Sequence, residues 1–163
     1  MNTKIIVVDY ANPQHANDLV MLLDSYSRDP MGANQALSET TKRQLADELG
    51  KIPGAFSVIC YVDNSPAGLA NCLMGFSTFQ CKPLVNIHDI AVHPDFRGKG
   101  LGPLLLAKTE KIARQRGCCR LTLEVLEGNQ IARSAYQKFG FAGYQLDPKL
   151  GQAHFWEKTL EPS

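Results

Sequence analysis

The chain has 163 residues, enough for one compact domain with a sizeable core, and 44% of them are hydrophobic. The net charge is only +1, which argues against an extensive nucleic-acid-binding surface, because such surfaces carry a basic excess. No apolar run approaches the roughly 20 residues that span a bilayer, and the first ten residues turn acidic too early for a signal peptide. We therefore expect a single cytoplasmic domain over residues 1–163 that binds neither nucleic acid nor membrane.

The five cysteines favour neither disulfides nor a metal site. Their number is odd, and no C-x-x-C pair occurs among them. Secreted disulfide frameworks usually pair an even number of cysteines in a shorter chain, and structural zinc sites need closely spaced ligands. We expect reduced thiols and no bound metal.

Hydrophobic periodicity and turn residues divide the chain into strands and helices. Strands are predicted at residues 4–10, 55–63, 67–79, 83–92, 119–126 and 154–160. Helices are predicted after Pro13, from Ser38 to Gly50, from Pro103 to Arg116 and over residues 129–140, with a loop at 27–34 between the first two. This order predicts a mixed α/β domain in which hairpins precede a β-α-β-α unit.

A glycine-rich segment, RGKGLG, lies where the fourth predicted strand gives way to the third helix. Gly98, Gly100 and Gly102 would let the backbone approach a ligand closely, and the start of a helix attracts anions. Arg97 and Lys99 add donors that suit phosphate oxygens. The local sequence leaves two interpretations open, a pyrophosphate cradle and a tight turn on a solvated surface.

Two other phosphate-binding motifs do not fit this segment. A P-loop requires G-x-x-x-x-G-K-[ST], which does not occur in the chain. The dinucleotide motif G-x-G-x-x-G fails because Pro103 and Leu105 stand where the third glycine would be. A nucleotide-binding module is therefore disfavoured.

The segment IAVHPDFRGKGLG resembles the acetyl-coenzyme A loop of the GNAT superfamily of N-acetyltransferases, whose pattern [RQ]-x-x-G-x-[GA] is filled by Arg97, Gly100 and Gly102. The segment LEVLEGNQIARSAYQKFGF is similar to a second motif of that family, with Tyr136 seven positions after Asn129. The two motifs cover the C-terminal half, and the N-terminal half matches by element order. The resemblance favours the cradle and implies a mixed, mostly antiparallel sheet of six or seven strands with about four helices.

The resemblance also implies how acetyl-CoA would be held, with no metal involved. Main-chain groups of Ile90 and Val92 would bind the acetyl carbonyl and the pantetheine arm, and the loop amides would bind the pyrophosphate. Tyr136 would protonate the departing thiolate, because a phenol with a pKa of about 10 stays protonated at neutral pH. Without the motif, Tyr136 would be interpreted as a core residue and Asn129 as a helix N-cap. The expected cofactor contacts are Ile90, Val92, Arg97, Gly98, Lys99, Gly100, Gly102, Pro103, Asn129 and Tyr136.

Candidates for the acceptor side lie on the strand before the loop. Strict alternation places Asn86, His88, Ile90 and Val92 on one face, so we predict that His88 faces the acceptor. An imidazole titrates near neutral pH and could deprotonate the amine directly or through a water. A half-buried histidine without a catalytic role is the alternative.

Three further side chains, Asp89, Asn86 and Glu124, are expected substrate contacts, and the loop 27–36 is expected to border the acceptor site. A solvated glutamate is the alternative for Glu124. Members of the family are often dimers, so a homodimer is one expected assembly.

The nature of the acceptor is the least specified part of the prediction. The stretch GFSTFQCKPLVNIHDIAV is similar to the diamine and thialysine acetyltransferase branch, which has an acidic pair where this chain has His88 and Asp89. The change at His88 removes a carboxylate that could hold a polyamine. We expect direct attack by a small primary amine in a ternary complex. The alternatives are a protein N-terminus or lysine as acceptor, or a non-catalytic acetyl-CoA sensor.

Overall fold

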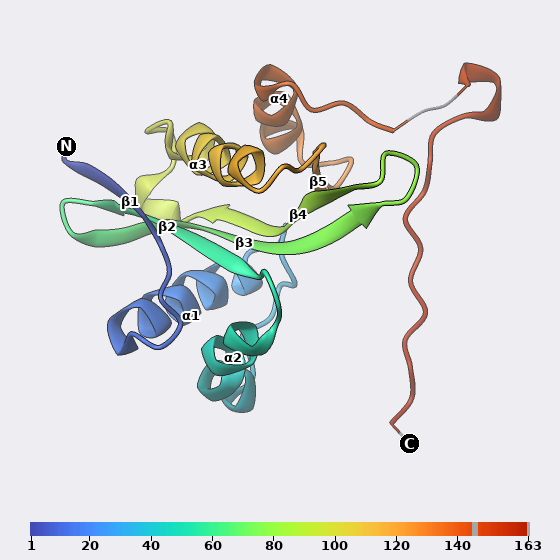
Figure 1. Cartoon of the computed structure of the whole chain (residues 1–163). Coiled ribbons are helices and arrows are strands. Elements are labelled where there is room, and N and C mark those ends of the chain that lie inside the picture. The colour runs from blue at the N-terminus through green and yellow to red at the C-terminus, as the bar shows by residue number, and fades with distance from the viewer. Residues whose placement is uncertain (145–146, 163) are drawn as a thin grey trace.

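A central sheet with helices on both faces forms the body of the molecule (Figure 1). The computed structural model describes residues 1–144 and 147–162. The strands are β1 (Thr3–Val7), β2 (Phe56–Val62), β3 (Ser65–Ser77), β4 (Lys82–Val92) and β5 (Leu121–Leu123), in that order across the sheet. The β4–β5 pair is parallel and the other neighbours are antiparallel. The predicted α/β class and mostly antiparallel sheet are confirmed.

The helices lie in two layers. They are α1 (Pro13–Arg28), α2 (Glu39–Lys51), α3 (Leu101–Gln115) and α4 (Gln130–Phe139), with short 3₁₀ turns at Pro94–Phe96 and Pro148–Leu150. Helices α1 and α2 cover one face of the sheet, and α3 and α4 cover the other (Figure 1). Local capping sets the helix starts, since the Ser38 hydroxyl accepts a hydrogen bond from the Thr41 amide at 3.1 Å.

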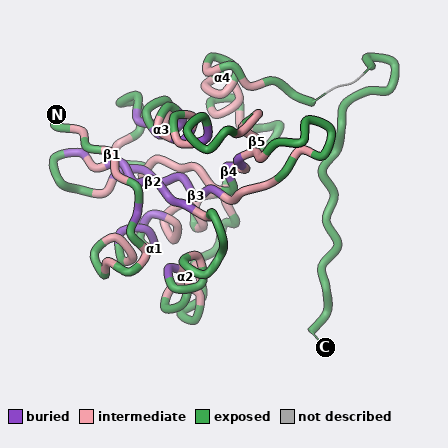
Figure 2. The backbone as a smooth tube through the Cα atoms, in the orientation of Figure 1, coloured by how far each residue is buried: buried purple, intermediate pink, exposed green. Residues whose placement is uncertain are grey.

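Each face of the sheet has its own apolar core, because successive side chains on a strand point to opposite faces. The α3-side cluster consists of Phe56, Val58, Cys60, Val62, Ala67, Ala70, Cys72, Val85, Ile87, Leu101, Leu105, Leu106 and Ala113. The α1-side cluster consists of Val8, Leu19, Leu22, Ile59 and Leu69. Figure 2 shows that this burial is concentrated in the middle of the sheet and the helices against it.

The C-terminal segment differs from the sequence prediction. Residues 154–160 pair with no strand in the part of the chain that the structure describes, so the sheet has five strands rather than six or seven. The segment leaves the body of the molecule in an extended course (Figure 1), and the side chains of Phe155, Trp156 and Leu160 are 79%, 84% and 82% exposed. Aromatic residues favour a strand only where a neighbouring edge pairs with it, and this segment lies away from such an edge.

Candidate active site

The glycine-rich segment forms an open turn at the start of α3. Gly98 and Gly100 have φ angles of +77° and +73°, which favour glycine, and Gly100 caps α3 without a side-chain hydrogen bond. A Cβ atom built at Gly102 would meet nothing within 4 Å, and its φ angle is not positive. Neither crowding nor backbone strain within the protein therefore requires glycine at position 102. Close approach of a ligand to the first turn of α3 would require it.

The two basic residues of the turn have different surroundings. Nη2 of Arg97 lies 2.7 Å from Oδ2 of Asp29, and Nε donates to the Val92 carbonyl at 3.3 Å. The Lys99 ammonium lies 5.1 Å from the centre of the Phe96 ring. Arg97 thus ties the glycine-rich turn to the end of α1, while Lys99 is exposed at its rim.

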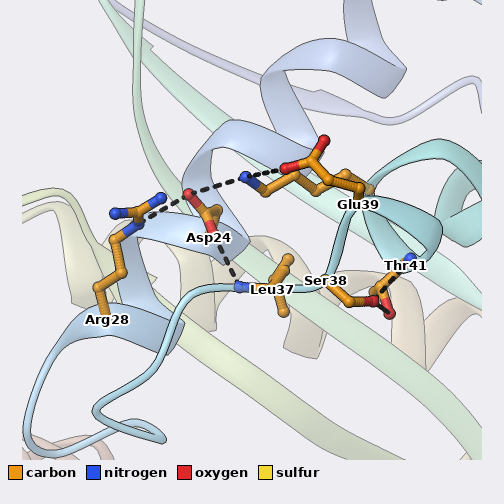
Figure 3. A network of polar contacts seen from close by, with 7 residues as sticks. Asp24, Arg28, Leu37, Ser38, Glu39 and Thr41 are labelled. Carbon is orange, nitrogen blue, oxygen red and sulfur yellow. Dashed lines mark hydrogen bonds and ion pairs between the residues drawn. The ribbon is translucent and has the colours of Figure 1, made fainter.

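The segment between α1 and α2 is fixed at both ends. The Asp24 carboxylate accepts hydrogen bonds from the Leu37 amide and from Nε of Arg28, each at 2.9 Å (Figure 3). At the other end, the hydrogen bond from Arg97 lowers the pKa of Asp29. This segment begins after Arg28, slightly later than predicted, and it lies beside the glycine-rich turn as the Asp29–Arg97 contact shows.

Strands β4 and β5 separate on the side of the glycine-rich turn. They pair only from Val85 to Ile87 of β4 and from Leu121 to Leu123 of β5. Beyond Ile87, β4 continues to Val92 with no described strand beside it on the β5 side. The main chain from His88 to Val92 therefore has no described strand partner on the β5 side, and it leads into the segment before α3.

A β-bulge changes the facing of residues along β4. Asn71 of β3 pairs with Asp89 and the next residue, Cys72, pairs with Ile87, so His88 is the extra residue. Ile87 and Ile90 consequently both pack on the α3-side cluster. The expected common face for Asn86, His88, Ile90 and Val92 is wrong, because the bulge interrupts the alternation.

The predicted acceptor-side residues have distinct environments. His88 is exposed at the bulge, whereas Asp89 is half-buried and its Oδ2 accepts a hydrogen bond from Nδ2 of Asn71 at 3.0 Å. Nδ2 of Asn86 donates to Oγ1 of Thr122 at 3.0 Å and so links β4 to β5. Glu124 is exposed just after β5 and forms no ion pair with another described residue.

Tyr136 of α4 is half-buried against the α3-side cluster, with its ring centre 6.0 Å from that of Phe141. Burial, with a smaller contribution from Tyr26, raises the pKa of Tyr136 to about 12. Burial also raises the pKa of Tyr26, and the charges of Asp89 and Asp29 add to that effect. Side chains on α1, β4 and α4 therefore influence one another electrostatically. Tyr26 was not identified as a site residue from the sequence, because it continues the helical spacing of the buried Leu19 and Leu22 and that spacing predicts an ordinary core position.

A groove of about 640 Å³ runs between the start of α3 and one side of α4. Its lining residues are Pro103, Gln130, Ile131, Ser134, Ala135, Lys138 and Phe139. Asn129 caps α4 by accepting a hydrogen bond from the Ala132 amide at 3.2 Å. Apart from Pro103, the sequence did not identify these residues, although the exposed Ile131 within an otherwise amphipathic helix was a usable signal.

The described residues contain neither a cluster of metal ligands nor a helix that could span a membrane. Within residues 1–144 and 147–162, no group of three or more His, Cys, Asp or Glu side chains is arranged to hold a metal ion. Among the helices in those same ranges, none is long and apolar enough to cross a membrane.

Comparison with known proteins gives a consistent family. Streptothricin acetyltransferase of Streptomyces lavendulae is 44% identical over 68 residues, which cover 42% of this chain and only 36% of that protein. Thialysine N-epsilon-acetyltransferase of Sus scrofa is 26% identical over 132 residues, 76% of this chain and 76% of that protein. The fold matches the structure of AAC(6')-Iy in complex with the bisubstrate analogue CoA-S-monomethyl-acetylneamine with a TM-score of 0.76 and 18% identity, covering 98% of this chain and 100% of that chain. A model of the acetyltransferase (GNAT) family matches residues 19–141, more than half of the chain, and the chain therefore belongs to that family.

Proposed function

We propose that the protein transfers the acetyl group of acetyl-CoA to the primary amine of a small molecule. The observation that carries this proposal is that β4 loses its pairing with β5 after Ile87 and then leads into the glycine-rich turn at the start of α3, which has no capping side chain. An extended ligand with a thioester at one end and a pyrophosphate further along fits that arrangement. GNAT proteins use acetyl-CoA as the acetyl donor.

The donor side would be held mainly by backbone groups. The amides from Arg97 to Pro103 would bind the pyrophosphate, because the start of α3 has unpaired N–H groups and no capping side chain. Main-chain groups of Ile90 and Val92 would bind the acetyl carbonyl and the pantetheine arm. Lys99 at the rim and Asn129 at the start of α4 would contact the same ligand. Acetyl-CoA supplies the activated acetyl group as a thioester.

The acceptor side would deliver the amine to that thioester. Asp89 would bind the protonated amine, and the exposed His88 would take a proton from it directly or through a water. The neutral amine would then attack in a ternary complex. Tyr136 would donate its proton to the departing thiolate, and its raised pKa keeps the phenol protonated at neutral pH. Asn86 and Glu124 would lie at the margin of this site.

The names of two relatives support a small acceptor. One is a streptothricin acetyltransferase and the other a thialysine N-epsilon-acetyltransferase, and both names designate a small molecule that is acetylated. The half-buried carboxylate of Asp89 also suits a cationic amine, because opposite charges attract.

Titration calorimetry with acetyl-CoA tests the donor site. Gly100→Glu should abolish binding, because it places a carboxylate at the start of α3. Gly117→Glu is the matched control, since Gly117 lies just past the other end of α3, has the same φ of +73° and is equally open. The control should bind like the wild type. No binding by the wild-type protein would overturn the proposal.

Thiol release tests the acceptor. The panel is 1,4-diaminobutane, spermidine, L-lysine, L-alanine and a peptide with a free N-terminus and an internal lysine. Turnover of one of the small amines is the expected result. Turnover of the peptide alone would assign a protein acceptor, and acetyl-CoA binding without any turnover would assign a sensor.

A further inference from the structure

A chain of four polar side chains crosses the sheet on the α1 side. The Tyr10 hydroxyl lies 2.8 Å from Oγ of Ser57, which lies 2.6 Å from Oδ1 of Asn71. Nδ2 of Asn71 in turn lies 3.0 Å from Oδ2 of Asp89. Ser57 and Asn71 are 0% and 4% exposed, so the middle of the chain is closed off from water.

The direction of every hydrogen bond in this chain is determined. An ionised carboxylate only accepts, so the Asn71 amide nitrogen must face Asp89 and donate to it. The amide oxygen of Asn71 then accepts the single proton of Ser57, which leaves the Tyr10 hydroxyl to donate to Ser57. Burial raises the pKa of Tyr10 and outweighs the opposing effect of the Ser57 hydrogen bond, so the phenol remains a donor. All three bonds are directed toward Asp89.

These hydrogen bonds can orient a carboxylate, but they cannot conduct protons. A proton relay needs groups that both gain and lose protons, and the amide of Asn71 does neither near neutral pH. Apolar residues at positions 57 and 71 would fill the same space, beside the α1-side pair of Ile59 and Leu69, without any need for buried hydrogen bonds. The polar chain is thus not explained by packing alone.

The register of the sheet connects the chain to the active site. Asn71 pairs with Asp89 directly next to the bulge at His88, so Asn71 holds Asp89 at the point where β4 changes its facing. The charge of Asp89 helps to raise the pKa of Tyr26, and Tyr26 in turn helps to raise the pKa of Tyr136. Only Oδ2 of Asp89 is bonded to a described residue, which leaves Oδ1 for a ligand.

We propose that Asn71, supported by Ser57 and Tyr10, is a positioning residue that fixes the Asp89 carboxylate to bind the ammonium form of the acceptor amine. The inference rests on the proposed acetyltransferase function. It deepens that function by assigning to Asn71 the orientation of the carboxylate, so that one oxygen of Asp89 remains for the amine.

Steady-state kinetics of Asn71→Ala tests the proposal with the amine of the panel above that gives the highest turnover. The KM for the amine should rise about tenfold or more, because a buried hydrogen bond to a charged group is lost. The KM for acetyl-CoA and the calorimetric Kd for acetyl-CoA should stay within about twofold. Tyr10→Phe removes only the outermost donor, should raise the same KM by a smaller factor, and serves if Asn71→Ala does not fold.

A double-mutant cycle separates positioning from a structural role. In an Asp89→Ala background, Asn71→Ala should cause no further rise in the KM for the amine, because the carboxylate that it orients is absent. An equal rise in both backgrounds, or equal changes in the KM values for both substrates, would overturn the proposal. If the wild-type protein does not bind acetyl-CoA, or turns over no amine, the proposed acetyltransferase function itself would be overturned.

Discussion

The two faces of the sheet are built from the same strands but have different chemistry. On the α3 side, β2, β3 and β4 contribute a continuous apolar cluster that supports α3 and thereby the glycine-rich turn. On the α1 side, the same strands place the buried Ser57 and Asn71 and the half-buried Asp89 in a hydrogen-bonded line beside the apolar residues. Alternation along a strand allows both, because neighbouring residues never share a face unless a bulge intervenes. One face thus supports the turn that we propose to hold acetyl-CoA, and the other places a carboxylate at the proposed acceptor site.

The largest expected effect on catalysis comes from Tyr136, the proposed general acid, which packs on the α3 side. Tyr136→Phe should lower kcat by about 10²–10⁴-fold, the usual contribution of a general acid. The ring that packs against Phe141 is retained, so the calorimetric Kd for acetyl-CoA should not change. An unchanged kcat would show that Tyr136 is a core residue and does not protonate the departing thiolate.

The apolar support of the donor face can be tested by stability. Leu105 of α3 is fully buried, and Leu105→Ala should lower the free energy of unfolding by about 2–5 kcal/mol. The neighbouring Leu104 is 40% exposed and is the matched control, for which the loss should be under about 1 kcal/mol. Urea denaturation measures both. Equal losses would show that α3 does not depend on the α3-side cluster.

Substitution of His88 tests whether the residue at the bulge acts as the base that deprotonates the amine. His88→Gln should lower kcat/KM by about tenfold near pH 7 and less at higher pH, where the amine loses its proton without assistance. Its side chain is exposed, so thermal unfolding should be unchanged. A uniform decrease across the pH range would contradict a role as base.

The smallest effect is expected for the contact between Arg97 and Asp29, which joins the two faces. Asp29→Asn should cost under about 1 kcal/mol of unfolding free energy at pH 7, because Arg97 is 54% exposed and water screens the pair. Asparagine can still accept the Met31 amide hydrogen bond through Oδ1, so the substitution removes only the ion pair and hydrogen bond with Arg97.

The pH dependence of that small difference has a definite sign. The folded-state pKa of Asp29 is lowered, chiefly by the hydrogen bond from Arg97, relative to an unfolded value of about 3.9. The stabilisation is therefore present in full above the unfolded value and is lost as the pH falls through the folded value. Urea denaturation of the wild type and of Asp29→Asn should show a smaller difference in unfolding free energy at about pH 3 than at pH 7. A difference that grows on acidification would contradict the assignment.

Features that depend on a few neighbouring residues were predictable from the sequence alone. The start of α2 at Ser38, the cap of α4 at Asn129 and the turn at Gly98 and Gly100 follow from local hydrogen bonding and from φ angles that glycine adopts easily. The same holds for the strand-to-helix position of the glycine-rich turn, on which the family resemblance depends.

Features that depend on how strands pair were decided only by the tertiary structure. The bulge at His88 arises from the register of β3 against β4, and it places Asp89 rather than His88 in hydrogen-bonding reach of Asn71. The strand expected at 154–160 does not form, because local propensity does not supply a neighbouring edge. Local sequence thus determined the glycine-rich turn, whereas contacts between residues distant in sequence determined that Asp89, and not His88, is bonded to Asn71.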